Sequence, residues 1–270
     1  MDAITDLPGY RITEQLYAGS RTLVYRAVWQ SDRTPVVIKL LRNEYPNCNE
    51  LVGFCNQYTI AKNLEFPSIV KPLTLETYQN SYALVMKNFG GVSVSNYLHL
   101  ATDYRQQYKV LPLAEFLKLA LQLTDILNYL YQNIVIHKDI KPTNILRVRE
   151  SKQVKLIDFS IASMLPRKTQ KVINFNILKG TFAYIFPEQT GIINRGIDYR
   201  SDFYYLGITF YGLLTVILPF VSIYAMKFVD FYLAKSALTL LQIDYKIPIF
   251  LSAIVSKPIP NNAEQPYHSA

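Results

Sequence analysis

The sequence has few of the residues that build metal centres and disulfide frameworks. Its 270 residues include two cysteines, Cys48 and Cys55, and three histidines. The cysteines do not form a Cys-x-x-Cys pair, and with so few histidines we expect no zinc site. Two reduced, partly buried thiols are typical of a cytoplasmic protein, and we predict that location.

Charge of one sign is not concentrated anywhere in the chain. The formal net charge of +8 would suit an acidic partner such as a nucleic acid or a phosphate-bearing ligand. However, the basic residues are scattered, and the aromatic residues lie within apolar periods instead of alternating with Lys and Arg. We therefore predict no nucleic-acid partner. A secretory signal is not expected either, because Asp2 and Asp6 stand where it needs a basic and then an apolar region.

Long apolar runs are scarce, and one segment stands out. Residues 206–226 are uncharged and about as long as a bilayer span, but Pro219 interrupts them. A helix buried on all sides within a large domain gives the same pattern. We predict the buried helix and no membrane partner, with a membrane-anchored module as the remaining alternative.

The pattern of apolar residues predicts a β-rich first part. Alternation and turn residues mark five strands, at 10–18, 22–30, 35–41, 69–77 and 81–87. Apolar residues at helical spacing predict one helix, at 49–64, between the third and fourth strands. This part should form a five-stranded sheet with one helix.

After Asn88 the pattern becomes helical. The paired glycines in 88–91 predict a hinge, and apolar spacing predicts a long helix over 112–133. A small hairpin follows at 144–148 and 154–159. The fold class is therefore α+β with two lobes. The expected parts are an extension at 1–9, a β-rich lobe at 10–87, the hinge at 88–91 and a helical lobe at 92–270.

Four polar stretches interrupt this pattern. They are "VVIK" at 36–39, "HKDIKPTN" at 137–144, "DFS" at 158–160 and "FPEQ" at 186–189. In this order they resemble the signature set of protein kinases: a strand lysine, the H-R-D catalytic loop, D-F-G and A-P-E. The resemblance covers nearly the whole chain. The second and third stretches are especially similar to serine/threonine kinase domains at the N-terminus of large bacterial hybrid sensor kinases.

The resemblance implies a two-lobed kinase-like fold, ATP and Mg²⁺ as cofactors, and a protein substrate with a Ser or Thr hydroxyl. It also implies downstream signalling modules on a longer relative. Phosphoryl transfer leaves little covalent work to a protein, so the site must neutralise charge, coordinate metal and position the hydroxyl.

Five residues would perform these tasks. By resemblance, Lys39 neutralises the ATP phosphates, Asp139 orients the substrate hydroxyl and accepts its proton, and Lys141 stabilises the charge of the transferring group. Asn144 and Asp158 supply the oxygen ligands that Mg²⁺ prefers. Taken singly, each also has a structural explanation, such as a snorkelling edge-strand lysine or a turn-capping side chain.

The resemblance also implies an apolar adenine pocket, with backbone groups of Lys87 and Phe89 at the edge of the base. Its other residues would be Leu16, Gly19, Val24, Val37, Met86 and Leu146. Five more residues would have structural or regulatory roles. They are Gln57 beside the strand lysine, His137 as a buried scaffold, Thr181 in the substrate loop, Glu188 as an anchor of the activation segment, and Asp202 as a tie to the catalytic-loop backbone.

Several positions depart from the family pattern. The glycine-rich loop keeps Gly19 alone, with Tyr17 and Thr22 at the other two glycine positions. Gln57 stands where the helix normally supplies Glu, so its contact with the strand lysine loses one charge. Pro266 stands where an Arg normally pairs with the anchoring Glu, and we expect the helical lobe to be shortened or degenerate after about residue 213. These departures favour the alternative of a pseudokinase or nucleotide-sensing scaffold that binds ATP or partners without turnover.

The Arg of H-R-D is Lys138 here, so a phosphorylated activation loop would lack a bidentate clamp. We therefore predict little dependence on loop phosphorylation. Thr169→Glu or Thr181→Glu should leave the rate of phosphate transfer from labelled ATP close to that of the wild type. Strong activation by either variant would contradict this prediction.

Overall fold

The computed structural model of the chain describes residues 7–100, 111–164, 198–219 and 237–259. Contacts between residues divide the chain into two compact units. The first unit comprises Met1–Val92 and Leu146–Ala162, and the second comprises Ser93–Ile145 and Ser163–Ala270.

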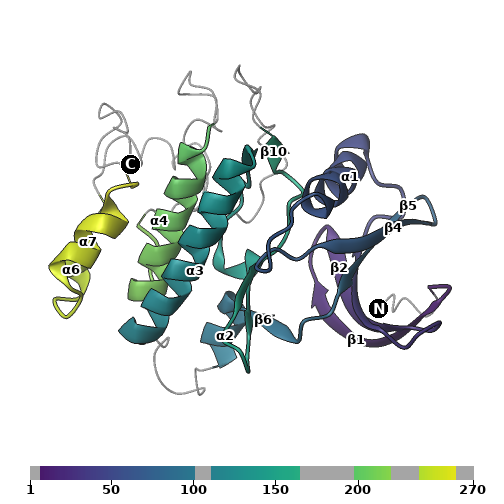
Figure 1. Cartoon of the computed structure of the whole chain (residues 1–270), viewed down its shortest axis with the longest axis horizontal. Helices are drawn as coiled ribbons and strands as arrows, with labels where there is room; N and C mark the ends of the chain where they lie inside the picture. The colour runs from purple at the N-terminus through teal and green to yellow at the C-terminus, as the bar shows by residue number, and fades with distance from the viewer. Residues whose placement is uncertain (1–6, 101–110, 165–197, 220–236, 260–270) are drawn as a thin grey trace. The chain divides into compact units, whose positions relative to one another are not determined.

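A five-stranded antiparallel sheet forms the centre of the first unit (Figure 1). Its order is β1-β2-β3-β5-β4, so β3 is the central strand, flanked by β2 and β5. The strands are β1 (Tyr10–Ala18), β2 (Thr22–Trp29), β3 (Pro35–Leu41), β4 (Pro72–Tyr78) and β5 (Ser81–Lys87). The prediction of five strands is confirmed, but β4 begins at Pro72 and not at residue 69. The reason is that peptide groups of Ser68 and Val70 hydrogen-bond with Leu156 instead.

Alternation along β3 gives the sheet two different faces. Ile38 and Leu40 are buried in one cluster with residues of β1 and β2. Val37 packs on the opposite side, in a second cluster that includes Phe54 of α1 (Cys48–Lys62). Lys39 shares that side by its register, so its side chain points toward the face that α1 covers.

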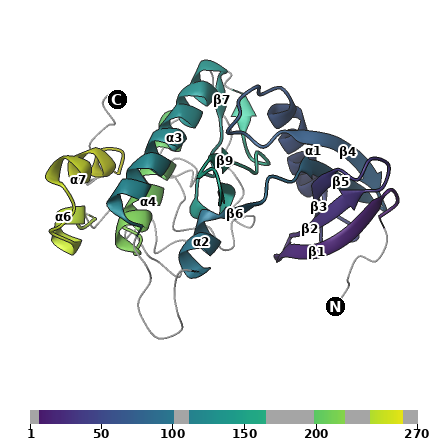
Figure 2. The ribbon, with the colours of Figure 1, turned by 60° about the horizontal axis from the view of Figure 1, so that its bottom comes forward.

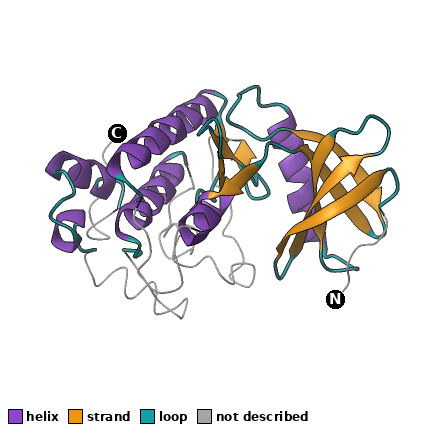
Figure 3. Ribbon diagram, turned by 90° about the horizontal axis from the view of Figure 1, so that it is seen from below, coloured by secondary structure: helices purple, strands orange, loops and turns teal. Residues whose placement is uncertain are grey.

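Helix α1 has well-defined ends and lies along one face of the sheet (Figure 3). It begins at a capping box, in which Asn47 and Glu50 each accept a hydrogen bond from the backbone N–H of the other. It ends before Asn63, whose side-chain amide donates to the carbonyl oxygen of Thr59 at 2.9 Å. This cap explains why the helix is shorter than the predicted 49–64.

The predicted hairpin is present as β8 (Ile145–Val148) and β9 (Val154–Leu156), with β6 (Gly91–Ser93) beside β8. The backbone of Gly91 lies close to β8, since a Cβ at this position would be in contact with the carbonyl oxygen of Arg147 at 3.4 Å. Because Leu156 hydrogen-bonds to the chain before β4, the hairpin packs with the first unit. By its contacts, the hairpin is grouped apart from the unit that contains α3 and α4.

The described part of the second unit is mainly helical. It contains α2 (Val94–Leu100), α3 (Leu113–Gln132), α4 (Arg200–Thr215), α6 (Leu240–Ile243) and α7 (Ile249–Ser256). It also contains the short antiparallel pair β7 (Val135–Ile136) and β10 (Ser163–Met164). Helix α3 begins directly after Pro112, as its helical spacing predicts.

Helices α3 and α4 run side by side (Figure 2), and the rings of Phe116 and Phe210 meet edge to face, 5.2 Å apart. Every residue of α4 from 204 to 211 is buried. Residues 206–215 of the apolar run thus lie in a largely buried helix, as predicted, whereas 216–219 follow the helix and Ile217 is exposed. None of the helices in the described ranges is both long and apolar enough to cross a bilayer.

Gly207 permits a close contact between α4 and the end of α7. A Cβ at this position would lie 2.8 Å from Cγ of Pro258, whose ring cannot rotate away. We predict that Gly207→Ala destabilises the protein by about 1–3 kcal/mol through overpacking. Thermal and urea unfolding measure this change.

Gly53 of α1 provides the matched control. A Cβ there would meet nothing nearer than Ser160 at 3.8 Å, which is ordinary contact. Gly53→Ala should therefore leave stability unchanged or raise it by up to about 1 kcal/mol, since alanine favours a helix. Equal stability of both alanine variants would contradict the tight contact at Gly207.

Candidate active site

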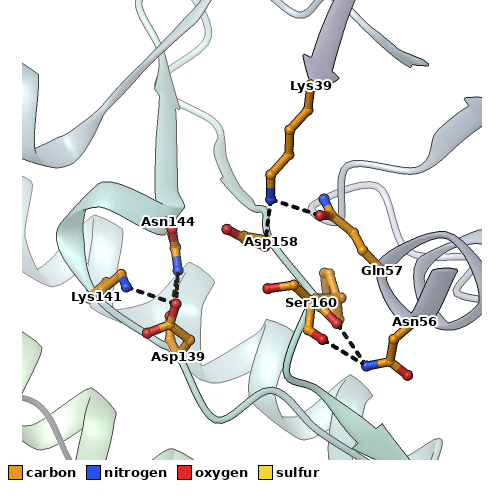
Figure 4. A network of polar contacts seen from close by, with 9 residues as sticks. Lys39, Asn56, Gln57, Asp139, Lys141, Asn144, Asp158 and Ser160 are labelled. Atoms are coloured by element: carbon orange, nitrogen blue, oxygen red, sulfur yellow. Dashed lines mark hydrogen bonds and ion pairs between the residues drawn. The ribbon is translucent and has the colours of Figure 1, made fainter. Parts of the chain in front are cut away.

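Lys39 is a buried cation on the central strand of the first unit. Its Nζ donates to Oε1 of Gln57 at 2.9 Å and forms an ion pair with Oδ1 of Asp158, also at 2.9 Å (Figure 4). The ring of Phe54 lies 5.6 Å from the same nitrogen. The side chain is only 10% exposed, so it is not a snorkelling edge-strand lysine. The amide and the carboxylate satisfy the ammonium group that β3 buries.

Asp158 follows shortly after the end of β9. Its φ of 67° is in the left-handed region, which is uncommon for a residue with a Cβ. The next residue, Phe159, is 1% exposed, and its carbonyl oxygen accepts a hydrogen bond from the N–H of Ala162. Burial of the following turn therefore supports the unusual backbone that directs the Asp158 carboxylate to Lys39.

Four of the residues predicted to line an adenine pocket pack together in the first unit. Val37, Met86, Phe89 and Leu146 belong to the cluster under α1. Leu16 is more exposed, at 36%. Val24 is half-buried, and Lys87 is exposed.

The turn between β1 and β2 contains Gly19. Its N–H donates to the carbonyl oxygen of Thr22 at 2.9 Å, and its own carbonyl accepts from Arg42 at 3.0 Å. The phenol ring of Tyr17 lies over Gly19, because a Cβ there would fall 2.4 Å from the Tyr17 hydroxyl. Because Tyr17 is 56% exposed, its ring could move aside for a larger residue at position 19.

The catalytic-loop residues lie in the second unit. Nζ of Lys141 is 2.8 Å from Oδ2 of Asp139, and Nδ2 of Asn144 donates to the same oxygen at 2.8 Å. Nδ2 of Asn144 also donates to the backbone carbonyl of Asp139 at 2.9 Å, across the 3-10 turn η1 (Pro142–Asn144). One cation and one amide therefore hold the Asp139 carboxylate (Figure 4).

Buried groups of α4 hold the backbone of this loop. The two carboxylate oxygens of Asp202 accept hydrogen bonds from the N–H groups of His137 at 2.8 Å and Lys138 at 2.7 Å. Burial raises the pKa of Asp202, although these bonds and the charges near it oppose the shift. His137 is fully buried, and its Nδ1 accepts from the N–H of Asp139 at 3.2 Å. The loop that presents Asp139 is thereby tied to the buried helix.

Asp158 and Asn144, the residues predicted to bind Mg²⁺, belong to different units. Their chemistry fits a hard cation, because a carboxylate and an amide oxygen are the ligands that Mg²⁺ accepts. Asn144 uses Nδ2 for its bonds to Asp139, which turns its Oδ1 away from that carboxylate. Within the ranges that the structure describes, His, Cys, Asp and Glu form no group of three or more that could hold a metal ion. Thr181, Glu188 and Pro266 lie outside the described residues.

Comparison with known proteins decides the family. A model of the protein kinase domain matches residues 10–252. The chain belongs to the protein kinase family. This membership confirms the predicted two-lobed kinase fold, with a β-rich and a helical part.

The relatives of this kinase domain include several bacterial proteins. A probable serine/threonine-protein kinase of Clostridium perfringens is 27% identical over 97% of this chain and 36% of its own length. Serine/threonine-protein kinase PrkC of Bacillus subtilis is 30% identical over 78% of this chain and 31% of its own length. A probable serine/threonine-protein kinase PknB of Lactococcus lactis is 25% identical over 96% and 40%. The chain thus spans about a third of the length of these relatives.

Two supporting residues of the kinase domain were not predicted from the sequence. Asn56 donates to the backbone after Asp158, and Thr209 of α4 donates through Oγ1 to the carbonyl oxygen of Ile140 at 3.0 Å. A polar residue within the apolar run of α4 was the available signal for Thr209. Asn56 has no comparable signal, because asparagine is also common on exposed helix surfaces.

Burial of Lys138 in the catalytic loop makes the stability of the protein depend on pH. Its side chain is buried, and its backbone lies in the left-handed region with φ 65°. Burial lowers its pKa from 10.5 to about 8, although the charge of Asp202 acts in the opposite direction. Between these two pKa values the unfolded chain binds more protons, so this group makes folding more favourable as pH rises. An arginine stays charged throughout this range.

We therefore predict that Lys138→Arg abolishes this rise in folding stability with pH. The difference in melting temperature between the wild type and the variant should widen in favour of the wild type as pH rises from about 8 toward about 10. Thermal unfolding across this range measures the difference. A difference that does not change with pH would contradict the buried lysine.

Proposed function

We propose that this kinase domain transfers the γ-phosphate of ATP to a Ser or Thr hydroxyl of a protein, with Mg²⁺ as the metal. The observation that supports this most is the Asp139 carboxylate, held at one oxygen by Lys141 and Asn144. A carboxylate fixed in this way can orient a hydroxyl and accept its proton. The names of the bacterial relatives support the choice of Ser and Thr.

The other proposed roles follow from charge. Lys141 would balance negative charge beside Asp139 while the hydroxyl attacks, and Lys39 would hold the α- and β-phosphates. When bound, Mg²⁺ would supply positive charge that offsets the negative charge of the phosphate groups. Asn144 and Asp158 would hold it through oxygen atoms. Gln57 would keep Lys39 in place without neutralising it, because an amide carries no net charge.

The nucleotide would lie against the apolar residues of the first unit. Val37, Met86, Phe89 and Leu146 already share one cluster, and backbone groups of Lys87 and Phe89 would meet the base. Leu16, Gly19 and Val24 would complete the proposed pocket. The lobes at 10–87 and 92–270, with a hinge at 88–91, remain part of the same proposal.

The wider context is also a proposal. The relatives are longer than this chain, and a hybrid sensor kinase with downstream signalling modules would agree with that difference in length. A cytoplasmic location would give such a kinase access to ATP and to protein substrates. Thr181 and Glu188 would act in the substrate loop and as the activation-segment anchor, respectively.

A pseudokinase is the second candidate. Two observations favour it: the neutral Gln57 as the helix partner of Lys39, and the Tyr17 ring over the one glycine of the loop. Both changes weaken features that hold ATP phosphates in active kinases. Such a protein would bind nucleotide without turnover.

The test combines labelled-ATP transfer to a generic protein substrate with ATP-induced thermal shift. We expect turnover by the wild type, and a loss of about 100-fold or more in Asp139→Ala, because a general base contributes that much. Asp158→Ala should lose turnover and also weaken the Mg²⁺-dependent shift. Asp125→Ala, which changes an exposed acid of α3, is the control and should match the wild type.

The outcomes separate the two candidates. Equal turnover by the wild type and Asp139→Ala would remove the kinase proposal. A thermal shift with ATP in a wild-type protein that transfers no phosphate would establish the pseudokinase.

A further inference from the structure

The side chain of Asn56 holds the backbone that follows Asp158. Its Nδ2 lies within hydrogen-bond distance of three carbonyl oxygens, at 3.3 Å from Phe159, 3.1 Å from Ser160 and 2.7 Å from Ala162. Figure 4 shows Asn56 pointing from α1 toward Ser160. One amide group therefore contacts three backbone carbonyl groups of the turn that follows Asp158.

Packing around this contact leaves the turn little room to move. Phe159 and Ala162 are buried, and Gly53, one helical turn before Asn56, brings the α1 backbone close to Ser160. A side chain at position 53 would be in van der Waals contact with that residue. The turn thus lies directly against the helix, and Asn56 provides its polar contacts there.

Asn56 and Gln57 are consecutive residues that hold the two partners of one ion pair. Gln57 accepts from Nζ of Lys39, and Asn56 donates to the turn that carries Asp158. Lys39 and Asp158 meet at 2.9 Å. Because both anchors are on α1, a shift of this helix would move both members of the pair.

We propose that Asn56 is a positioning residue that sets the place of the Asp158 carboxylate. This inference rests on the proposed kinase function, in which that carboxylate holds Mg²⁺. The neutral Gln57 forms a weaker link between α1 and the site than a Glu would, and the Asn56 amide supplies the second link. Its requirement is a hydrogen-bond donor, since all three partners are carbonyl oxygens that cannot donate.

The test uses Asn56→Asp, which keeps the shape of the side chain but replaces the donor with a charged acceptor. Asn56→Ser is the milder variant, because its hydroxyl is too short to reach the same carbonyls. Asn49→Asp is the matched control, since it makes the same change at an exposed position of the same helix.

The first measurement is hydrogen–deuterium exchange of residues 158–164 in the protein without ATP. We expect exchange there to be about tenfold faster or more in both Asn56 variants, since loss of the hydrogen bonds to these part-buried carbonyl groups weakens local structure. Asn49→Asp should match the wild type. Unchanged exchange in both Asn56 variants would overturn the inference.

The second measurement is the Mg²⁺ concentration that gives half-maximal turnover. It should rise several-fold in Asn56→Ser while remaining unchanged in Asn49→Asp, because the metal-binding carboxylate is displaced. A fall in kcat with an unchanged Mg²⁺ requirement would also overturn the inference, since a merely structural role gives that result. A wild type without turnover would overturn the kinase function, while the exchange measurement would still decide the role of Asn56.

Discussion

The burial of one positive charge on a central strand constrains the whole first unit. Lys39 lies on β3, between β2 and β5, so its ammonium group cannot reach water along a sheet edge. A buried charge needs a counter-charge and hydrogen-bond acceptors. Asp158 provides the first and Gln57 the second. Helix α1 and the turn after β9 must therefore lie where these two side chains can reach Lys39.

The second unit also buries an ionisable side chain, in this case an acid. Asp202 is buried in α4, and backbone N–H groups of His137 and Lys138 satisfy its two oxygens. These bonds fix the residues immediately before Asp139. In each unit, one buried charge thus positions the backbone that presents a candidate catalytic carboxylate. Burial opposes the charge of Asp202, because it raises the pKa of this carboxyl group, while the two N–H bonds and nearby charges act in the other direction.

Much of this arrangement could be predicted from the sequence because it follows local periodicity. The bounds of β1, β3 and β5 agree with the apolar alternation, and α3 begins directly after Pro112. The polar stretches also indicated Lys39 and Asp139 as candidate site residues, because their motifs are short and contiguous. These features require no knowledge of distant contacts.

Other features depend on contacts that alternation does not encode. Residues 69–71 have strand-like composition, but the peptide of Val70 bonds to Leu156, more than 80 positions away in the sequence. The same contact assigns the β8–β9 hairpin to the first unit. Asn56 was missed for a related reason, since its three acceptors are backbone carbonyls about 100 positions later. Backbone acceptors leave no side-chain signature in a sequence.

The replacement of Glu by Gln at position 57 changes how the buried charge is shared. A glutamate would give Lys39 a second anionic partner beside Asp158, whereas an amide accepts a hydrogen bond without adding negative charge. In this chain Asp158 is therefore the anionic partner that Lys39 contacts through Nζ. A ligand that drew Asp158 away would leave the ammonium group positively charged, still held by Gln57, and directed at the ligand's own negative groups. The neutral substitution thus weakens the tie between helix and strand but preserves the charge needed to attract phosphate.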